Sequence, residues 1–336
     1  MSLRQSVPGL VRRGVNRLPD DMRKELGRRA SELKGIGQLK ANQALLAKRL
    51  ADLEARELGA RPAPPDVVDD RFPPGVRSRI CTQAQLAEPW FDAWSRELRE
   101  PAYAHRKSWE FTYIAEVLQA MGQLQPGRRG LGFGVGREPL VAALANRGVS
   151  ILATDLDPEA KEARAWLRTD QHADNIEAMS RPEVCDPAKF RELVDWRAVD
   201  MRAIPSDLRG FDFCWSACAL EHLGTLEEGM RFVEQSLETL VPGGIAVHTT
   251  EYNLYSNDST IESGPVVVYR QRDLEELRTR LEGQGHELAA YDLAPGDGLL
   301  DHYVDLPPYA EEPCLRFLFG SYTLTSVALV IRTRAS

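Results

Sequence analysis

A glycine-rich turn near the middle of the chain constrains the fold more than any other feature. Residues 130–136 read GLGFGVG, and residues 151–155 read ILATD, so a short apolar strand ends in Asp155 some twenty residues after the turn. Gly132, Gly134 and Gly136 carry no Cβ atom, so the backbone can turn tightly there and a ligand can approach closely. This order is typical of two parallel strands joined through a turn and a helix.

The spacing of the glycines restricts the kind of ligand. Arg137 and Glu138 stand where a dinucleotide fingerprint would place its third glycine, and no GK[ST] triplet is present to bind a triphosphate. An ordinary tight loop is the alternative if the turn is considered alone. The carboxylate of Asp155 can accept hydrogen bonds from two ribose hydroxyls, so the pair of features favours a nucleoside-bearing ligand without a pyrophosphate.

Two later segments complete a series of four motifs. Residues 211–223 read FDFCWSACALEHL, an apolar run that ends in polar residues, and residues 240–250 read LVPGGIAVHTT, with a turn before a strand. In this order the motifs resemble the class I S-adenosylmethionine-dependent methyltransferases over roughly residues 105–336. The resemblance implies an α/β fold with a doubly wound, mostly parallel seven-stranded sheet, and S-adenosylmethionine as cofactor.

The hydrophobic pattern predicts the same alternation of strands and helices. We expect helices over residues 85–99 and 107–121, the second burying Trp109, Tyr113, Ala115, Val117 and Leu118. The expected strands lie at residues 130–134, 150–154, 196–199, 211–215, 245–250, 287–293 and 325–332.

Composition divides the chain into three parts. Residues 1–60 form a helical arm, residues 61–100 a proline-rich linker and a lead-in helix, and residues 101–336 the catalytic domain. The prolines at 61–65 and 72–74 indicate a stiff, extended linker rather than a core element.

The arm carries an apolar stripe with coiled-coil spacing. Its large apolar residues follow steps of three and four that Gln43 interrupts, which places them on one seam of a helix. They are Ile36, Leu39, Leu46, Leu50 and Leu53. The helix would lie either on its own catalytic domain or against other copies of the chain. We favour a homo-oligomer, because such a stripe must be buried against something.

Charge and hydropathy exclude several classes of partner. The net charge of −8 and the pI near 5.5 argue against a nucleic-acid-binding surface, and no apolar run is long enough to cross a bilayer. Five scattered cysteines and the lack of a signal-peptide pattern indicate the cytoplasm. Arg12, Arg13 and Arg17 leave open a peripheral association with anionic lipid at the inner membrane surface.

Ligands of such sheets bind at the carboxyl ends of the strands, so the candidate residues converge on one edge. The resemblance implies that Asp155 holds the ribose, and that Asp200 and Met201 contact the adenine. Arg106 is expected to pair with the methionine carboxylate of the cofactor, because its planar guanidinium suits two-point donation. Asp200 would otherwise be an exposed loop residue, and Arg106 part of a solvated basic turn. The expected cofactor-binding residues are Gly132, Phe133, Gly134, Gly136, Asp155, Leu156, Asp200, Met201, Ser216 and Arg106.

Catalysis is expected from polar residues that follow two adjacent strands. His222 is the predicted base because histidine titrates near neutral pH, and Glu221 and His248 complete the catalytic set. The alternative for His222 is a histidine that only holds a loop. Glu221 and the segment 248–253 should lie within several ångströms of each other, since their strands are neighbours.

Acceptor binding is expected from Glu251, Asn253, Asp301, His302 and Tyr303. These polar and aromatic side chains favour a hydroxylated acceptor. The layout also resembles bacterial methyltransferases of envelope-glycan synthesis, which implies O-methylation of a sugar in a surface glycan or glycolipid. The alternatives are methylation of a small natural product and a non-catalytic S-adenosylmethionine-binding or scaffold protein. Imidazole and carboxylate groups would suffice to bind a divalent ion, but no fixed ligand spacing supports one, so no metal site is predicted.

Overall fold

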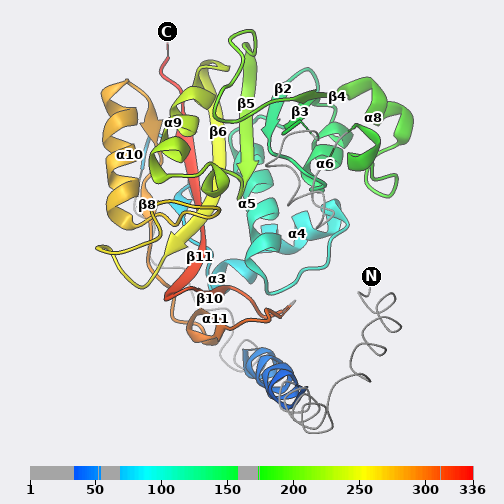
Figure 1. Ribbon diagram of the computed structural model, residues 1–336. Coiled ribbons are helices and arrows are strands. Elements are labelled where there is room, and N and C mark those ends of the chain that lie inside the picture. The colour runs from blue at the N-terminus through cyan, green and yellow to red at the C-terminus, as the bar shows by residue number, and fades with distance from the viewer. Residues whose placement is uncertain are drawn as a thin grey trace, which may run out of the picture.

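The computed structural model describes residues 34–51, 53, 69–157, 173, 175–310 and 312–335. Its centre is a sheet of nine strands with helices on both faces (Figure 1). The sheet order is β4 (Val194–Ala198), β3 (Ser150–Asp155), β2 (Arg129–Phe133), β5 (Phe211–Ala217), β6 (Leu240–Asn253), β11 (Tyr322–Arg332), β10 (Arg316–Phe319) and β9 (Val304–Asp305), while β7 (Glu287–Leu288) also pairs with β11. The strands from β4 to β6 are parallel and β11 runs antiparallel to β6. The predicted α/β fold with a doubly wound, mostly parallel sheet is confirmed.

All seven predicted strands are present, but the one expected over residues 287–293 is broken. Only β7 joins the main sheet, and β8 (Tyr291–Asp292) leaves it to pair with β1 (Ser78–Arg79) in a separate two-stranded sheet. The break follows from Tyr291, whose hydroxyl donates to the carbonyl of Leu274 and whose ring lies under Arg278. The strands β9 and β10 were not predicted and extend the sheet beyond seven.

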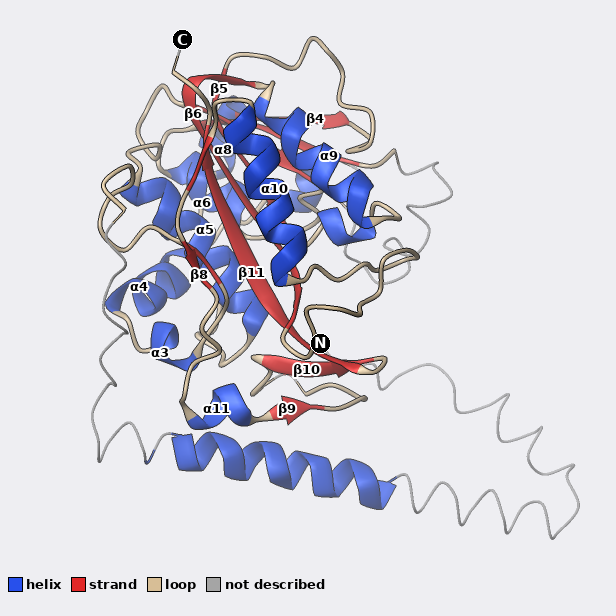
Figure 2. Ribbon diagram, turned by 90° about the vertical axis from the view of Figure 1, so that its left-hand side faces the viewer, coloured by secondary structure: helices blue, strands red, loops and turns tan. Residues whose placement is uncertain are grey.

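Helices cover both faces of the sheet, as Figure 2 shows for the two sides of β11. The helices are α3 (Gln83–Leu86), α4 (Pro89–Leu98), α5 (Arg106–Ala120), α6 (Leu140–Asn146), α8 (Pro187–Leu193), α9 (Leu226–Leu237), α10 (Gln271–Gly283) and α11 (Leu299–His302), with 3-10 turns η1 (Glu177–Met179) and η2 (Leu220–His222). Successive residues of a strand point to opposite faces. Accordingly Phe213 and Trp215 pack with α4, α5 and α6, whereas Cys214 packs with α9 and α10.

The second predicted helix is confirmed as α5, and its five predicted core residues are all buried. The first, expected over residues 85–99, is split into α3 and α4 at Pro89. Proline disfavours the helical conformation of the residue before it, and Glu88 is extended, with φ −73° and ψ 143°. Pro89 then occupies the first turn of α4, where its missing N–H costs nothing.

Phe72, in the segment at residues 72–74, belongs to the core, whereas Pro74 is exposed. Phe72 is buried, and the guanidinium of Arg332 lies 4.7 Å from the centre of its ring. The prediction of a linker outside the core is therefore wrong at Phe72, because its ring packs in the hydrophobic core beside Arg332 of β11. The prolines at 61–65 lie outside the described residues, and the proposed domain limits stay a prediction.

A helix over residues 34–51 and 53 lies beside α11 and β9 (Figure 2). It packs on the domain through the small residues Ala44, Ala47 and Ala51, and Lys40 forms an ion pair with Asp305 at 3.4 Å. Lys48 pairs with Glu312. Alanine allows this close approach because its side chain is small.

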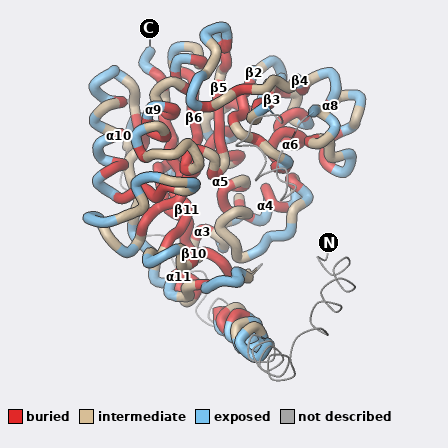
Figure 3. The backbone as a smooth tube through the Cα atoms, in the orientation of Figure 1, coloured by how far each residue is buried: buried red, intermediate tan, exposed pale blue. Residues whose placement is uncertain are grey.

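The predicted leucine seam of this helix faces away from the domain, and Figure 3 shows the helix buried along only part of its surface. Each seam residue is at least half exposed, and Leu39 is 70% exposed. The rest of the predicted arm, including Arg12, Arg13 and Arg17, lies outside the described residues. Among the helices that are described, none combines the length and the apolar character needed to cross a membrane.

Candidate active site

A cavity of about 870 Å³ opens at the carboxyl ends of the parallel strands. Loops that follow β2, β3, β4 and β5 form one part of its wall, and the start of α5 and the β10–β11 hairpin form another. The structure brings together most of the residues that the sequence singled out. Those lining the cavity are Arg106, Gly134, Gly136, Asp155, Leu156, Asp200, Met201, Glu221, His222 and Glu251.

The glycine turn forms one wall of this cavity through two residues in the left-handed conformation. Gly134 has φ 58° and Gly136 has φ 49°, values that side chains with a Cβ atom rarely adopt. A Cβ atom on Gly134 would lie 3.0 Å from the Cβ of Ala219 and 3.4 Å from the sulfur of Met201. The turn is therefore a cradle whose backbone, rather than a side chain, faces the ligand.

Asp155 ties the end of β3 to this turn. Its carboxylate accepts hydrogen bonds from the backbone N–H groups of Gly136 at 3.1 Å and Leu156 at 2.8 Å. These bonds hold a carboxylate in the cavity wall next to the glycine cradle, which is the arrangement that ribose recognition requires. The predicted juxtaposition of Asp155 and the turn is thus present.

Asp200 and Met201 follow β4 on the same side of the cavity. Met201 is buried, whereas the carboxylate of Asp200 pairs with Arg202 at 2.7 Å. The hydrogen bond from Arg202 lowers the pKa of Asp200 below its usual range, so the carboxylate is ionised at neutral pH. It can still accept a further hydrogen bond, because a carboxylate has several lone pairs.

The Arg106 guanidinium is already paired with carboxylates of the same chain. Its guanidinium donates to Glu251 at 2.8 Å and to Glu110 at 3.2 Å, and it lies 4.3 Å from the centre of the Phe317 ring. Two carboxylates already neutralise this buried charge. The expected contact of Arg106 with the cofactor carboxylate stays a prediction, and the structure shows that partners within the chain already bind this guanidinium.

Around Arg106 the chain builds what we call the floor cluster, consisting of Arg106, Lys107, Glu110, Cys218, Glu221 and Glu251. The Lys107 ammonium donates to Glu110 at 3.1 Å, and the Cys218 thiol donates to the same carboxylate at 3.1 Å. Thr250 donates to Glu221 at 3.2 Å, so the predicted meeting of these two strand ends is confirmed. Burial raises the pKa of the Glu251 carboxyl above its ordinary value.

Three members of the floor cluster were missed by the sequence analysis. Glu110 lies four residues after Arg106 and three after Lys107, a helical spacing that could have indicated its ion pairs. Cys218 follows a strand directly, and the sequence around it offers no signal except the Cys-x-x-Glu spacing to Glu221. The aromatic residues Tyr309, Phe317 and Phe319 also line the cavity, but they lie far along the chain from every motif.

His222 lies in the cavity wall with a defined orientation. Its Nδ1 atom is 2.8 Å from the carbonyl oxygen of Pro265, and its Nε2 atom is 3.9 Å from Glu221 Oε1. A carbonyl oxygen can only accept a hydrogen bond, so Nδ1 carries the proton in the neutral ring and Nε2 carries the lone pair. This tautomer suits a base that acts through Nε2.

His248 and Ser216 lie in the core instead of the cavity. Nδ1 of His248 is 2.8 Å from Ser216 Oγ, and Nε2 is 3.1 Å from Ser236 Oγ on α9. The side chain is fully buried, and burial lowers the pKa of His248 to about 3. The predicted catalytic role of His248 and the cofactor contact of Ser216 are therefore not supported. The two side chains form a hydrogen bond with each other in the core, on the face of the sheet that α9 covers.

Gly132 and Phe133 also pack in the core instead of lining the cavity. A Cβ atom on Gly132 would lie 2.4 Å from Val135 Cγ1 and 2.5 Å from Trp215 Cζ2, so packing within the chain requires this glycine. The ring of Phe133 packs edge-to-face on Phe232, with centroids 5.2 Å apart. Neither residue lines the cavity.

The predicted acceptor residues of the last loops lie elsewhere. Asp301 accepts a hydrogen bond from the backbone of Gln83 at 2.9 Å and pairs with Arg316, and the neighbouring His302 is exposed on α11. Asn253 holds the loop after β6 through its bonds to Ser259 and Tyr255. Together with Tyr303, these side chains do not line the cavity, because α11 and β9 carry the loop to the far side of β10.

Comparison with known proteins identifies the central part of the chain. Residues 131–248 match the methyltransferase domain family. No match was found among curated protein sequences.

Several solved structures are similar to this chain. One is a candidate sarcosine dimethylglycine methyltransferase from Galdieria sulphuraria, with 16% identity, a TM-score of 0.44 and coverage of 68% of this chain and 85% of the other. Another is magnesium protoporphyrin IX methyltransferase from Synechocystis PCC 6803 with bound SAH, with 11% identity, a TM-score of 0.40 and coverage of 72% and 94%.

Replacing His248 with glutamine tests its placement in the core. The buried imidazole stays neutral in the folded chain down to about pH 3, whereas it is protonated below about 6.5 when unfolded. The free energy of unfolding should therefore fall as the pH drops from 6.5 towards 3, by up to about 1.4 kcal/mol per pH unit. We expect His248→Gln to weaken this pH dependence in urea unfolding and to leave S-adenosylmethionine binding unchanged. An unaltered pH dependence, or a loss of binding, would contradict the placement.

Proposed function

We propose that the chain is an S-adenosylmethionine-dependent methyltransferase that methylates a sugar hydroxyl of a cell-surface glycan or glycolipid. The proposal starts from the match of residues 131–248 to the methyltransferase domain family. The observation that carries the proposal is the cavity itself. It places the glycine cradle and Asp155 at one part of its wall and His222, two carboxylates and aromatic rings at another. The first part suits a nucleoside and the second a polyhydroxylated acceptor.

The residues on the glycine side fit the cofactor. Gly134 and Gly136 leave room for it, since a Cβ atom on Gly134 would fill space beside Ala219 and Met201. Asp155 would accept hydrogen bonds from the ribose hydroxyls, with Leu156 beside it, and Asp200 and Met201 would contact the adenine. When bound, S-adenosylmethionine supplies an electrophilic sulfonium methyl group.

The residues on the opposite side suit a hydroxylated acceptor. The carboxylates of Glu221 and Glu251 can accept hydrogen bonds from neighbouring hydroxyls, and Tyr309, Phe317 and Phe319 offer rings to the face of a sugar. The acceptor residues proposed here are therefore Glu221, Glu251 and the three aromatic rings. Asp301, His302, Tyr303 and Asn253 are left out because they lie outside the cavity.

His222 is the proposed base. An alcohol is a weak nucleophile until its proton is removed, and neutral imidazole can accept that proton through Nε2. The hydrogen bond from Nδ1 to Pro265 fixes the ring orientation, and Glu221 lies close enough to stabilise the imidazolium that forms. The same bond to Pro265 would be made by a histidine that only holds a loop, so turnover must be measured directly.

A cationic acceptor is the second candidate. The three carboxylates of the floor cluster outnumber the cations Arg106 and Lys107, and aromatic rings stand next to them. Such surroundings attract an ammonium group. A small amine or natural product would then replace the glycan, with the same cofactor chemistry.

The exposed seam of the N-terminal helix supports a further proposal, that copies of the chain associate through it. Ile36, Leu39, Leu46, Leu50 and Leu53 form one apolar row, while the alanine face of the same helix already packs on the domain. A second copy offers an identical row with the same spacing, so burial of the two rows against each other is symmetric. Association at a membrane surface through Arg12, Arg13 and Arg17 stays a separate prediction.

Two substitutions separate cofactor binding from catalysis. Asp155→Ala should raise the Kd for S-adenosylmethionine about 10- to 100-fold, because charged hydrogen bonds contribute about 1.5–3 kcal/mol. His222→Ala should leave this Kd unchanged and lower kcat about 10²- to 10⁴-fold. Calorimetry and turnover with labelled cofactor measure the two effects. Asp207→Ala, at an exposed carboxylate paired with Arg197, is the control and should change neither. Near wild-type turnover of His222→Ala would refute the base assignment.

The acceptor class is tested by incubating the protein with methyl-labelled S-adenosylmethionine and matched sets of surface glycans, glycolipids and small amines. We expect label in a glycan or glycolipid as a methyl ether, because the floor carboxylates and rings suit a sugar. Mass spectrometry of the labelled product identifies the methylated atom. Label only on amines would favour the cationic acceptor, and cofactor binding without any labelled product would favour a non-catalytic binding protein.

The seam is tested by sedimentation equilibrium of the double variant Leu46→Glu, Leu50→Glu. Charged residues on the seam cannot be buried against their copies, so the wild-type oligomer should dissociate into monomers. The matched control is Leu45→Glu, which is half exposed on the same helix but lies off the seam, and it should leave the oligomer intact. A monomeric wild-type chain would overturn the proposal.

A further inference from the structure

In their ionised forms, the carboxylates of the floor cluster outnumber its cations. Arg106 and Lys107 supply two positive charges against the three carboxylates of Glu110, Glu221 and Glu251. All three carboxylates are buried, with Glu251 only 5% exposed. An uncompensated charge away from water is costly, and either a bound cation or a retained proton removes that cost.

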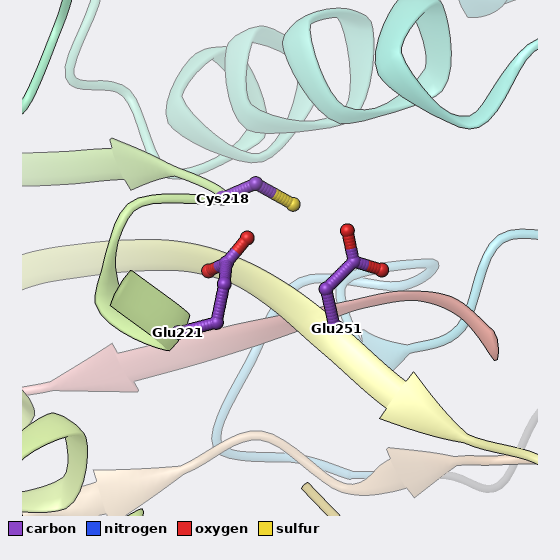
Figure 4. A group of neighbouring side chains, drawn as sticks. All are labelled: Cys218, Glu221 and Glu251. Atoms are coloured by element: carbon purple, nitrogen blue, oxygen red, sulfur yellow. The ribbon is translucent and has the colours of Figure 1, made fainter. Parts of the chain in front are cut away.

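Three side chains of this cluster point towards one another, as Figure 4 shows for Cys218, Glu221 and Glu251. They come from the loop after β5, from η2 and from the end of β6. One potential ligand atom from each side chain lies within 4.8 Å of the other two. Sulfur and two carboxylate oxygens at this separation can close around one ion with small side-chain movements.

Glu251 provides a second, independent observation. Its Oε1 atom is held by Arg106 at 2.8 Å. Its Oε2 atom is buried and has no hydrogen-bond partner among the described residues. A buried carboxylate oxygen without a donor is a position that a ligand can satisfy, because leaving such an oxygen unpaired costs free energy.

The backbone of Cys218 is held in an unusual conformation that presents its sulfur to this point. Cys218 has φ 48°, in the left-handed region that residues with a Cβ atom rarely occupy. Its N–H donates to the Thr249 hydroxyl at 3.0 Å, which ties it to β6. Strained positions of this kind cluster at functional sites.

We propose that Cys218, Glu221 and Glu251 bind one divalent transition-metal ion of the zinc class, through the thiolate of Cys218 and one oxygen of each carboxylate. Sulfur ligation distinguishes zinc and similar ions from magnesium and calcium, which prefer oxygen alone. Binding releases the Cys218 proton to solvent, which raises the excess negative charge of the cluster to two. A divalent ion balances that charge, while Arg106 and Lys107 remain paired with Glu110.

The remaining coordination position would face the cavity, since Cys218, Glu221 and Glu251 all line it. If the proposed methyl transfer to a hydroxyl holds, the ion would bind the acceptor oxygen there and lower the pKa of its hydroxyl, and the proton would pass to His222. This role rests on the proposed function, whereas binding of the ion does not.

The experiment is a titration of the full-length protein with Co²⁺, without cofactor or acceptor. We expect saturation at one ion per chain, with a thiolate-to-cobalt charge-transfer band in the near ultraviolet, and displacement of the band by Zn²⁺. Cys218→Ser should abolish the band, and Glu251→Gln, which keeps the side-chain volume, should weaken Co²⁺ binding at least tenfold. Cys214→Ala is the control and should retain the band, because this buried thiol lies on β5 and packs with α9 and α10.

Two results would overturn the site. One is a wild-type protein that binds no Co²⁺ at one ion per chain, and the other is a charge-transfer band that persists in Cys218→Ser. Circular dichroism of each variant establishes that it is folded, and Glu251→Gln tests the site without touching the thiol. Because the titration contains no S-adenosylmethionine, its failure leaves the proposed methyl transfer standing, and failure of methyl transfer leaves the metal site standing.

Discussion

This structure depends on one constraint. Successive side chains of a strand point to opposite faces of the sheet, and helices cover both faces. His248 and Glu251 lie three positions apart on β6, so their side chains leave opposite faces of the sheet. His248 meets Ser236 of α9 in the core, whereas Glu251 meets Arg106 of α5 at the cavity. An odd number of positions along the strand therefore places the structural imidazole and the carboxylate of the site on opposite faces.

The charge balance of the floor cluster follows from the same arrangement. The first turn of α5 brings Arg106, Lys107 and Glu110 over the ends of β5 and β6, where Glu221 and Glu251 face them. In surroundings with little water, ionic groups hold one another in place more strongly than at the surface. Arg106 thus positions two carboxylates, and the unsatisfied oxygen of Glu251 is the group on which the proposed metal site depends.

Features that depend on local backbone geometry were predicted well. Gly134, Gly136 and Asp155 lie on consecutive parts of one strand, turn and strand unit, so their juxtaposition follows from the chain order alone. Residues whose partners lie far away were predicted poorly. Asp301 bonds to Gln83, more than two hundred positions earlier, and Arg106 bonds to Glu251, and no local pattern indicates either pairing. The aromatic wall formed by Phe317 and Phe319 was missed for the same reason.

The amino-acid sequence by itself determined the α/β architecture, the glycine turn, the acidic strand end and the methyltransferase motifs, because each depends on periodicity or on residues close in the chain. Only the tertiary structure decided which polar groups reach the cavity. It placed His248 and Asp301 away from it and gathered Glu110, Cys218, Glu221 and Glu251 at its floor. The physical reason is that strand facing and long-range ion pairs depend on which elements pack together, and many distant residues jointly determine that packing.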